Sequence, residues 1–322
     1  MKPLFNEAEF DQQVAAVVAK LQAADNVLHC SGHIEADSET GSEAGSETGG
    51  RISLTRVEND ADYLESFSKL RNLKVVLVPG AFHREYPQHR GDGEFICSAI
   101  RELGLDITRI DLPSFCSVDR AAEFIWDWFR NYSGEPVMLV SLSKGGADTL
   151  AFFSLLESKG IAVEKYCRSW VSICGLLRGT AVVEALRCER ARYLLIRLLF
   201  KWFRYSISDL DSLSRAGFNE RGERALAKLS IPSYHVVGVP RFSELSSRFA
   251  RRAARRVWAL GDSQGRASDG GGILLSDYLT YPGKVIAVYG QDHYFKELCV
   301  KQVLAIVLQQ ESARGFSLAS GI

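Results

Sequence analysis

The sequence lacks any apolar run long enough to cross a bilayer. The longest apolar stretch, Tyr193 to Phe200, is interrupted by Arg197. The first residues, MKPLFNEAEFDQQ, also lack the apolar core of a secretory signal. These absences exclude a membrane-spanning protein and predict a protein that stays in the cytoplasm.

Cysteine pairs of the kind that hold zinc are absent as well. The seven cysteines are an odd number, and they show neither C-x-x-C pairs nor another zinc-ligand spacing. His29 and His33 lie four residues apart, but no third ligand lies near them in the sequence, which disfavours a metal site. We interpret the cysteines as buried or free thiols in a reducing, cytoplasmic setting, and we expect neither a metal nor a cofactor.

The chain has no excess of charge of either sign, with 39 basic and 39 acidic side chains. The balance is uneven, because residues 1–70 hold 13 acidic and 5 basic residues, and the remainder is correspondingly basic. With 322 residues and 46% hydrophobic content, the composition is that of a globular protein with room for one large domain and an insertion.

The first 72 residues are predicted to form a helix followed by a β-hairpin. Residues 6–24 carry apolar side chains at helical spacing, and two β-like runs follow, Asn26 to Ile34 and Arg51 to Val57. The intervening EADSETGSEAGSETGG buries too little apolar surface to offset the cost of ordering it. We predict a solvated, mobile hairpin tip there and disfavour an acidic segment that binds a partner.

From Leu73 onward, buried strands alternate with helices. This alternation predicts a mostly parallel sheet covered by helices on both faces. Ligands bind such sheets at the carboxyl ends of the strands. The expected strands are 73–80, 107–113, 137–140, 167–173, 233–239 and 284–290, and the expected helices are 94–103, 118–132, 145–158 and 296–309.

Residues 175–230 interrupt the alternation with helical sequence, which we interpret as a cap packed over the site. One face of its first part is basic, and a membrane-surface helix is the less favoured alternative, so peripheral membrane contact through the basic cap stays open. The basic residues are Arg187, Arg190, Arg197, Lys201 and Arg204.

A second basic run occurs in a helix that follows Val239. Such a run is most often a solvated surface, and no base-reading or phosphate-cradling motif accompanies it, so we expect no nucleic-acid partner. Its residues are Arg248, Arg251, Arg252, Arg255 and Arg256.

The stretch PVMLVSLSKGGADTL, from Pro136 to Leu150, has the pattern of a nucleophile elbow. A buried strand brings Ser143 to a sharp turn, and a helix begins at Gly145 directly behind it. Small residues are needed because the strand and helix backbones nearly touch there. The usual pattern is G-x-S-x-G, and Ser141 stands at the first position here.

A serine nucleophile needs a base, and the base needs a carboxylate that fixes its tautomer. His293 follows the last strand in GQDHYF, and Asp269 lies in the glycine-rich loop SDGGG. Both loops are expected at the sheet edge that holds Ser143. The alternatives to Asp269 as the acid are Asp262, which is the stronger, and then Asp277 and Asp292.

Taken together, these motifs resemble those of α/β-hydrolases, and lipase-like and esterase-like members most. The resemblance spans Leu73 to Gln309, and the order nucleophile, acid, base is the one found in that family. It implies an α/β-hydrolase core of residues 73–174 and 231–312, a cap of residues 175–230, and antiparallel leading strands before residue 58. Residues 313–322 are expected from their own sequence to form a flexible tail. The matching segments are Val78 to Phe82, Ser141 to Gly145, Ser268 to Gly270 and Gly290 to His293.

The same resemblance implies an oxyanion hole and a reaction. The backbone N–H of Lys144 and one from the loop containing Ala81 and Phe82 would bind the oxyanion, and His83 and His89 would lie at the pocket rim. The expected function is a serine hydrolase that cleaves a small-molecule ester or thioester through an acyl-enzyme on Ser143. Acyl transfer on the same scaffold and a non-catalytic binding module are the alternatives.

Overall fold

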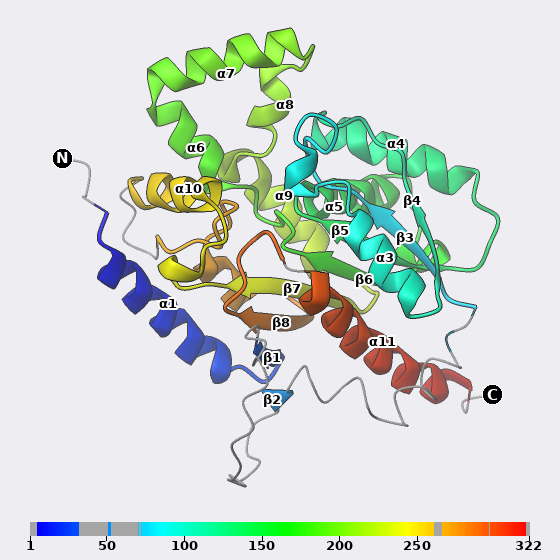
Figure 1. Cartoon of the computed structure of the whole chain (residues 1–322). Helices are drawn as coiled ribbons and strands as arrows, with labels where there is room; N and C mark the ends of the chain where they lie inside the picture. Colours follow the sequence, from blue (N-terminus) through cyan, green and yellow to red (C-terminus); the bar gives the residue numbers. More distant parts are fainter. Residues whose placement is uncertain are drawn as a thin grey trace, which may run out of the picture.

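One parallel sheet forms the centre of the molecule (Figure 1). The computed structural model describes residues 5–31, 51–52, 70, 72–260, 266–295 and 297–319. Within these residues the sheet has eight strands in the order β2-β1-β8-β7-β6-β5-β3-β4, and every neighbouring pair is parallel. The strands are β1 (Val27–Ser31), β2 (Arg51–Ile52), β3 (Lys74–Val78), β4 (Asp106–Arg109), β5 (Val137–Leu142), β6 (Cys167–Ile173), β7 (Ser233–Val239) and β8 (Lys284–Tyr289).

The central strands form where the sequence is mostly apolar. Every residue of β5 and β7 is buried, and β6 exposes only Arg168. Parallel strands covered by helices on both faces are buried along almost their whole length because neither face meets water. The predicted mostly parallel sheet, with helices on both of its faces, is confirmed.

Helices cover both faces of the sheet. Figure 1 shows α1, α3 and α11 in front of it, with α3 and α11 packed on each other, while α4, α5 and α9 form the layer behind. Phe129 of α4 stacks on Phe152 of α5 with ring centroids 5.1 Å apart, which joins two helices of that layer. The bounds are α1 (Glu7–Gln22), α3 (Glu94–Glu102), α4 (Val118–Arg130), α5 (Lys144–Ser158), α9 (Arg215–Ala227) and α11 (Glu297–Ala319).

The predicted hairpin of antiparallel leading strands is wrong. In the described residues, β1 pairs in parallel with β2 on one side and with β8 on the other. His29 pairs with both Arg51 and Ala287 in this register. The pairing with β8 places β1 next to the last strand of the chain, which local sequence patterns do not indicate. The acidic stretch of residues 35–50 lies outside the described residues.

The C-terminal helix is longer than predicted. We expected a flexible tail from residue 313, but α11 continues to Ala319, and only residues 320–322 lie outside the described part. The buried Glu311 accepts a hydrogen bond of 2.7 Å from the Tyr234 hydroxyl, and Arg168 lies 3.7 Å from it. This contact with β6 and β7 holds the helix beyond the predicted end at Gln309.

The segment of residues 175–230 divides into two parts. Helices α6 (Ala181–Cys188), α7 (Arg190–Trp202) and α8 (Ile207–Asp211) stand above the sheet, whereas α9 packs against α5 (Figure 1). Helix α10 (Arg248–Trp258) packs on α6 from the side of the core. None of the helices in the described ranges combines the length and apolarity that a bilayer span requires.

Candidate active site

Ser143 occupies a strained turn between β5 and α5. Its φ of 51° and ψ of −116° are unusual for a residue with a side chain. A Cβ on Gly145 would lie 2.5 Å from the carbonyl oxygen of Val78, so the close approach of the helix to β3 requires glycine there. The turn therefore has the geometry that the sequence pattern predicts for a nucleophile elbow.

The substitution of serine for the first glycine of the elbow has a structural explanation. Ser141 is fully buried on β5, and its Oγ accepts a hydrogen bond of 2.9 Å from the indole N–H of Trp170 on β6. Trp170 is itself fully buried between the Phe153 and His235 rings. Ser141 thus satisfies a buried donor on the neighbouring strand while leaving the turn at Ser143 intact.

Replacing Ser141 with alanine should destabilise the fold without disabling the site. The change leaves the buried Trp170 N–H without its acceptor, which costs about 1–3 kcal/mol. Urea unfolding measures this loss of stability. Trp170→Phe, which removes the donor, is the second variant in a double-mutant cycle with Ser141→Ala. A Ser141→Ala protein as stable as the wild type would contradict this role.

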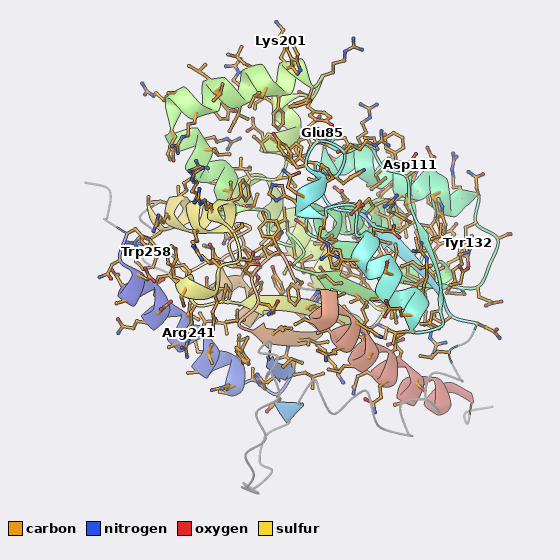
Figure 2. The ribbon with its side chains drawn as sticks, in the orientation of Figure 1. Glu85, Asp111, Tyr132, Lys201, Arg241 and Trp258 are labelled. Carbon is orange, nitrogen blue, oxygen red and sulfur yellow. The ribbon has the colours of Figure 1, made fainter. Side chains whose placement is uncertain are left out.

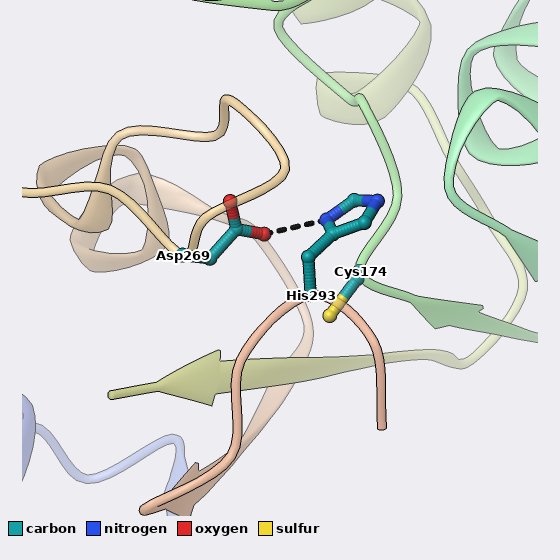
Figure 3. A group of neighbouring side chains, drawn as sticks. All are labelled: Cys174, Asp269 and His293. Atoms are coloured by element: carbon teal, nitrogen blue, oxygen red, sulfur yellow. Dashed lines mark hydrogen bonds and ion pairs between the residues drawn. The ribbon is translucent and has the colours of Figure 1, made fainter. Parts of the chain in front are cut away.

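His293 and Asp269 complete a hydrogen-bonded chain with Ser143. The His293 Nε2 lies 2.9 Å from the Ser143 Oγ, and the Nδ1 lies 2.7 Å from the Asp269 Oδ2 (Figure 3 shows the second contact). The backbone N–H of His293 also donates to the Asp269 carbonyl at 2.8 Å. Three side chains that are up to 150 positions apart in the sequence meet at the carboxyl ends of β5 and β8 and in the loop before Ile273.

The carboxylate of Asp269 is completely buried and held by several donors. Its Oδ1 accepts hydrogen bonds from the N–H groups of Gly271 (2.9 Å) and Ile273 (3.1 Å), and its Oδ2 accepts one from the Tyr278 hydroxyl (3.2 Å). A Cβ on Gly271 would lie 2.0 Å from the His293 ring, so the glycine-rich loop is needed for the ring to reach the carboxylate. These contacts fix the orientation of both groups.

The environment of His293 favours its protonated form. Burial disfavours the imidazolium, but the adjacent Asp269 carboxylate, together with the charge of Asp292, outweighs burial and raises the pKa of His293 above its usual 6.5. Two other described histidines have pKa values shifted in the opposite direction. Burial lowers the pKa of His89, and it lowers that of His235 to about 4. A carboxylate that stabilises the imidazolium is what a general base next to a serine needs.

The alternative acids are engaged elsewhere. Asp277 forms a two-pronged ion pair with Arg215, and Asp292 accepts hydrogen bonds from the N–H and hydroxyl of Ser246, both 2.7 Å. Asp262 lies outside the described residues. Of the described candidates, only Asp269 contacts His293 Nδ1.

The predicted oxyanion-hole donors differ in their availability. In the described part of the chain, the N–H groups of Lys144 and Ala81 donate to no acceptor, but the N–H of Phe82 donates to the Ser114 carbonyl at 2.7 Å. The prediction for Phe82 as a donor is therefore wrong, because a fold contact already uses its only N–H. Its ring instead stacks on Phe115 at 4.4 Å, which supports the loop that holds Ala81.

The two histidines predicted for the pocket rim are half-buried beside the same loop. The His83 Nδ1 lies 3.1 Å from the Gly80 carbonyl oxygen. The His89 ring lies 5.5 Å from Tyr294, the neighbour of His293, and 5.1 Å from Phe249. Both therefore lie near the site without contacting Ser143.

Sequence reasoning missed a buried ion pair next to the nucleophile. The Lys144 ammonium donates to the Asp148 carboxylate at 2.6 Å, and the two side chains are 4% and 3% exposed. Burial raises the pKa of Asp148 to about 6, although the Lys144 charge opposes the shift. From the sequence alone, a role is predicted only for the backbone N–H of Lys144 and none for its side chain. Its spacing of four from Asp148 at the start of a helix was the available signal.

A second missed contact ties the upper helices to the loop of Ala81. The Tyr205 hydroxyl donates to Glu85 at 2.5 Å, and Ser114 donates to the other oxygen of Glu85. The rings of Phe200 and Tyr205 also meet Phe82 edge-on, with centroids 6.0 and 6.2 Å apart. The segment after α7 is thus anchored beside the site by both polar and aromatic contacts.

Solved structures with a similar fold identify the architecture of the chain. The chain is similar to a metagenomic carboxyl esterase, with a TM-score of 0.52 and 16% identity, over 97% of this chain and 96% of the other. It is also similar to a Bacillus licheniformis lipase in its mature form, with a TM-score of 0.50 and 14% identity, over 74% of this chain and 91% of the other. The chain has the α/β-hydrolase fold.

This α/β-hydrolase-fold chain has no match among protein-family models or curated proteins. The structural neighbours establish its fold. Because one fold supports many activities, the reaction must be argued from the site.

Proposed function

We propose that the protein is a serine hydrolase that cleaves a small-molecule carboxylic ester or thioester. The observation that carries the proposal is the chain from Ser143 through His293 to Asp269, set at a strained turn. A serine beside a histidine whose other nitrogen faces a buried carboxylate is an activated nucleophile. The esterase and lipase architecture of the structural neighbours is consistent with this chemistry.

In the first half of the reaction, the Ser143 Oγ attacks the substrate carbonyl carbon as its proton passes to the His293 Nε2. The negative charge on the carbonyl oxygen is stabilised by the N–H groups of Lys144 and Ala81, which point to no acceptor in the described chain. The imidazolium then gives its proton to the leaving alcohol or thiol, which leaves an acyl-enzyme. Water releases the acid by the same steps, and His293 is again the base.

Labelling with a fluorophosphonate tests the proposal directly. We expect the wild-type protein to lose its hydrolysis of activated esters as one phosphonyl group is added to Ser143. Peptide mass spectrometry identifies the labelled residue. A panel of esters and thioesters of graded acyl length then defines the substrate. Folded protein that neither labels nor hydrolyses the panel would favour a binding module. An acyl-enzyme that turns over only when an alcohol or amine is added would indicate an acyltransferase.

The pH dependence of activity should reflect the raised pKa of His293. Only the neutral imidazole accepts the serine proton, so kcat/KM falls as the pH drops through that pKa, with a midpoint above 6.5. His235 cannot account for this limb, because burial lowers its pKa to about 4. The measurement is kcat/KM between pH 4 and pH 9 on a neutral ester. An acidic limb centred near pH 4 would contradict the assignment.

We further propose that α7 contacts a membrane surface. The inward side of this helix carries Tyr193, Ile196 and the buried Phe200, and the outward side is apolar, with Leu198 66% and Trp202 83% exposed. Large apolar side chains on the side of a helix that faces water mark an interaction surface. In Figure 1, α7 lies at the end of the molecule remote from the sheet, where a flat partner can reach it.

The charges around this apolar side favour an anionic lipid surface as the partner. Arg190, Arg197 and Lys201 recur along one edge of α7, and the helix contains no acidic residue. Figure 2 shows Lys201 directed away from the body of the protein. Apolar residues flanked by basic ones are typical of helices that lie in the membrane interface.

Co-sedimentation with phosphatidylcholine vesicles, with and without an anionic lipid, tests this contact. The double variant Arg197→Gln and Lys201→Gln should bind anionic vesicles at least tenfold more weakly, since each basic residue contributes about 1 kcal/mol near such a surface. Trp202→Ser should weaken binding to both vesicle types. The matched control, Arg251→Gln with Arg252→Gln on α10, should bind as the wild type does. Unchanged binding by the α7 variants, or self-association of the protein without vesicle binding, would contradict the proposal.

A further inference from the structure

Cys174 lies beside the two side chains that follow Ser143 in the hydrogen-bonded chain. Its sulfur, a carboxylate oxygen of Asp269 and a ring nitrogen of His293 all lie within 4.8 Å of one another, and all three residues are buried (Figure 3). Cys174 follows β6 directly, so the cluster gathers the ends of two strands and one loop. The spacing of these residues in the sequence gave no sign of a ligand set.

The three donors are a set that zinc accepts. Thiolate, imidazole and carboxylate are its ordinary protein ligands, and three of them leave a fourth position open. A zinc ion bound to one thiolate, one carboxylate and a neutral imidazole gives a cluster without net charge. That neutrality suits a site where Cys174 and Asp269 are both 0% exposed, since burial of an unbalanced charge is costly.

The distances require only small movements. Ligand bonds of about 2.0–2.3 Å in a tetrahedral site place the donor atoms roughly 3.3–3.6 Å apart. The 2.7 Å contact between His293 and Asp269 must therefore open slightly, and the sulfur, which lies up to 4.8 Å from the other two donor atoms, must approach them by up to roughly 1.2–1.5 Å. The Asp269 Oδ1 keeps its two N–H donors throughout, because the Oδ2 is the atom that faces the ring.

We propose that Zn²⁺ binds to Cys174, Asp269 and His293 and reversibly inhibits the enzyme. The inhibitory effect rests on the proposed hydrolase function, whereas the binding does not. On binding, the Cys174 thiol releases its proton to solvent as the zinc–sulfur bond forms. The ring proton of His293 moves from Nδ1, which takes the metal, to Nε2, which faces the Ser143 Oγ at 2.9 Å. No group is oxidised or reduced.

Inhibition follows from the tautomer that the metal imposes. With a proton on Nε2, the imidazole donates to Ser143 and has no lone pair with which to accept the serine proton. The Asp269 carboxylate is also drawn from the ring to the metal. The ion therefore disables the base without occupying the space where the substrate carbonyl lies. Because the cluster is buried, the ion enters when the surrounding loops open, so inhibition should develop over the time of incubation.

The experiment separates binding from inhibition. Competition with a chromophoric zinc chelator gives the zinc affinity of the wild type, Ser143→Ala and Cys174→Ala. Ester hydrolysis is measured separately, with the wild type and Cys174→Ala, after incubation with Zn²⁺ and again after addition of EDTA. We expect Ser143→Ala to bind zinc as the wild type does. Cys174→Ala should bind at least about 100-fold more weakly, keep its hydrolase activity and lose its zinc sensitivity.

Matched controls and contrary outcomes are available in the same chain. Cys116→Ala removes another buried thiol, and Cys188→Ala the exposed one, and both should leave binding and inhibition unchanged. Mg²⁺, which prefers oxygen ligands, should have no effect. Equal zinc affinity in the wild type and Cys174→Ala would overturn the site. Zinc bound through Cys174 with hydrolysis undiminished would overturn the inhibitory mechanism. Protein that binds zinc but never hydrolyses an ester would contradict the proposed function while leaving the site intact.

Discussion

Replacing Ser143 with alanine should lower kcat for ester hydrolysis by a factor on the order of 10⁶, with KM little changed. The alanine removes the atom that we propose forms the acyl bond, whereas the N–H groups of Lys144 and Ala81, which we propose bind the carbonyl oxygen, remain. Fluorophosphonate labelling should disappear together with turnover. Steady-state kinetics on an activated ester and intact-protein mass spectrometry measure the two effects.

The neighbouring residues provide the controls for this variant. His293→Ala should cost about as much as Ser143→Ala, and the double variant should cost little more, because the two residues act as a unit. Asp269→Asn should lower kcat by about 10⁴, since the amide stabilises the wrong tautomer. Ser141→Ala lies two residues before Ser143 and should retain its activity. Labelling that persists in Ser143→Ala would disprove the assignment of the nucleophile.

Asp148→Ala should destabilise the protein by about 3–5 kcal/mol. The variant leaves the Lys144 ammonium buried without its partner in the first turn of α5, where the helix dipole also disfavours a positive charge. Phe115, whose ring centroid lies 5.7 Å from the ammonium, compensates only in part. Equilibrium unfolding in urea measures the loss of free energy.

A double variant separates the cost of an unpaired charge from the loss of packing. Lys144→Met with Asp148→Leu replaces both charges with apolar groups of similar volume, and it should be much more stable than Asp148→Ala, because no charge is left buried. The N–H of Lys144 that we propose binds the oxyanion belongs to the backbone, so the double variant should keep measurable hydrolase activity. Stability of Asp148→Ala within about 1 kcal/mol of the wild type would show that water reaches the pair.

The strands, and the order of the three site residues along the chain, could be predicted from the sequence because they depend on local patterns. Buried parallel strands have mostly apolar sequences, and the predicted bounds of β6 and β7 match the observed ones. The turn at Ser143 needs small residues at fixed positions, and a parallel sheet brings the loops after its strands to one edge. Those two constraints suffice to predict that Ser143, Asp269 and His293 meet.

The errors arose where a residue's partner is distant in the sequence. The pairing of β1 with β8 joins segments about 260 residues apart, and no local pattern encodes which edge a leading strand occupies. Two other contacts likewise depend on which groups the fold brings within 3 Å of each other. The Phe82 N–H donates to the Ser114 carbonyl, and the Tyr234 hydroxyl donates to Glu311 of α11. Hydrogen bonds of this kind are decided by position to within a fraction of an ångström.

The sequence by itself determined the class of fold, the elbow at Ser143 and the order of the three residues that we propose as nucleophile, acid and base. These follow from the periodicity of burial and from steric limits on a tight turn, both of which are local. Only the tertiary structure decided that Ser141 accepts a hydrogen bond from Trp170, that Lys144 is paired with Asp148, and that Cys174 lies near Asp269 and His293. Each of these is a contact of buried polar groups, and burial removes water as an alternative partner, so the packed fold determines which protein group takes its place.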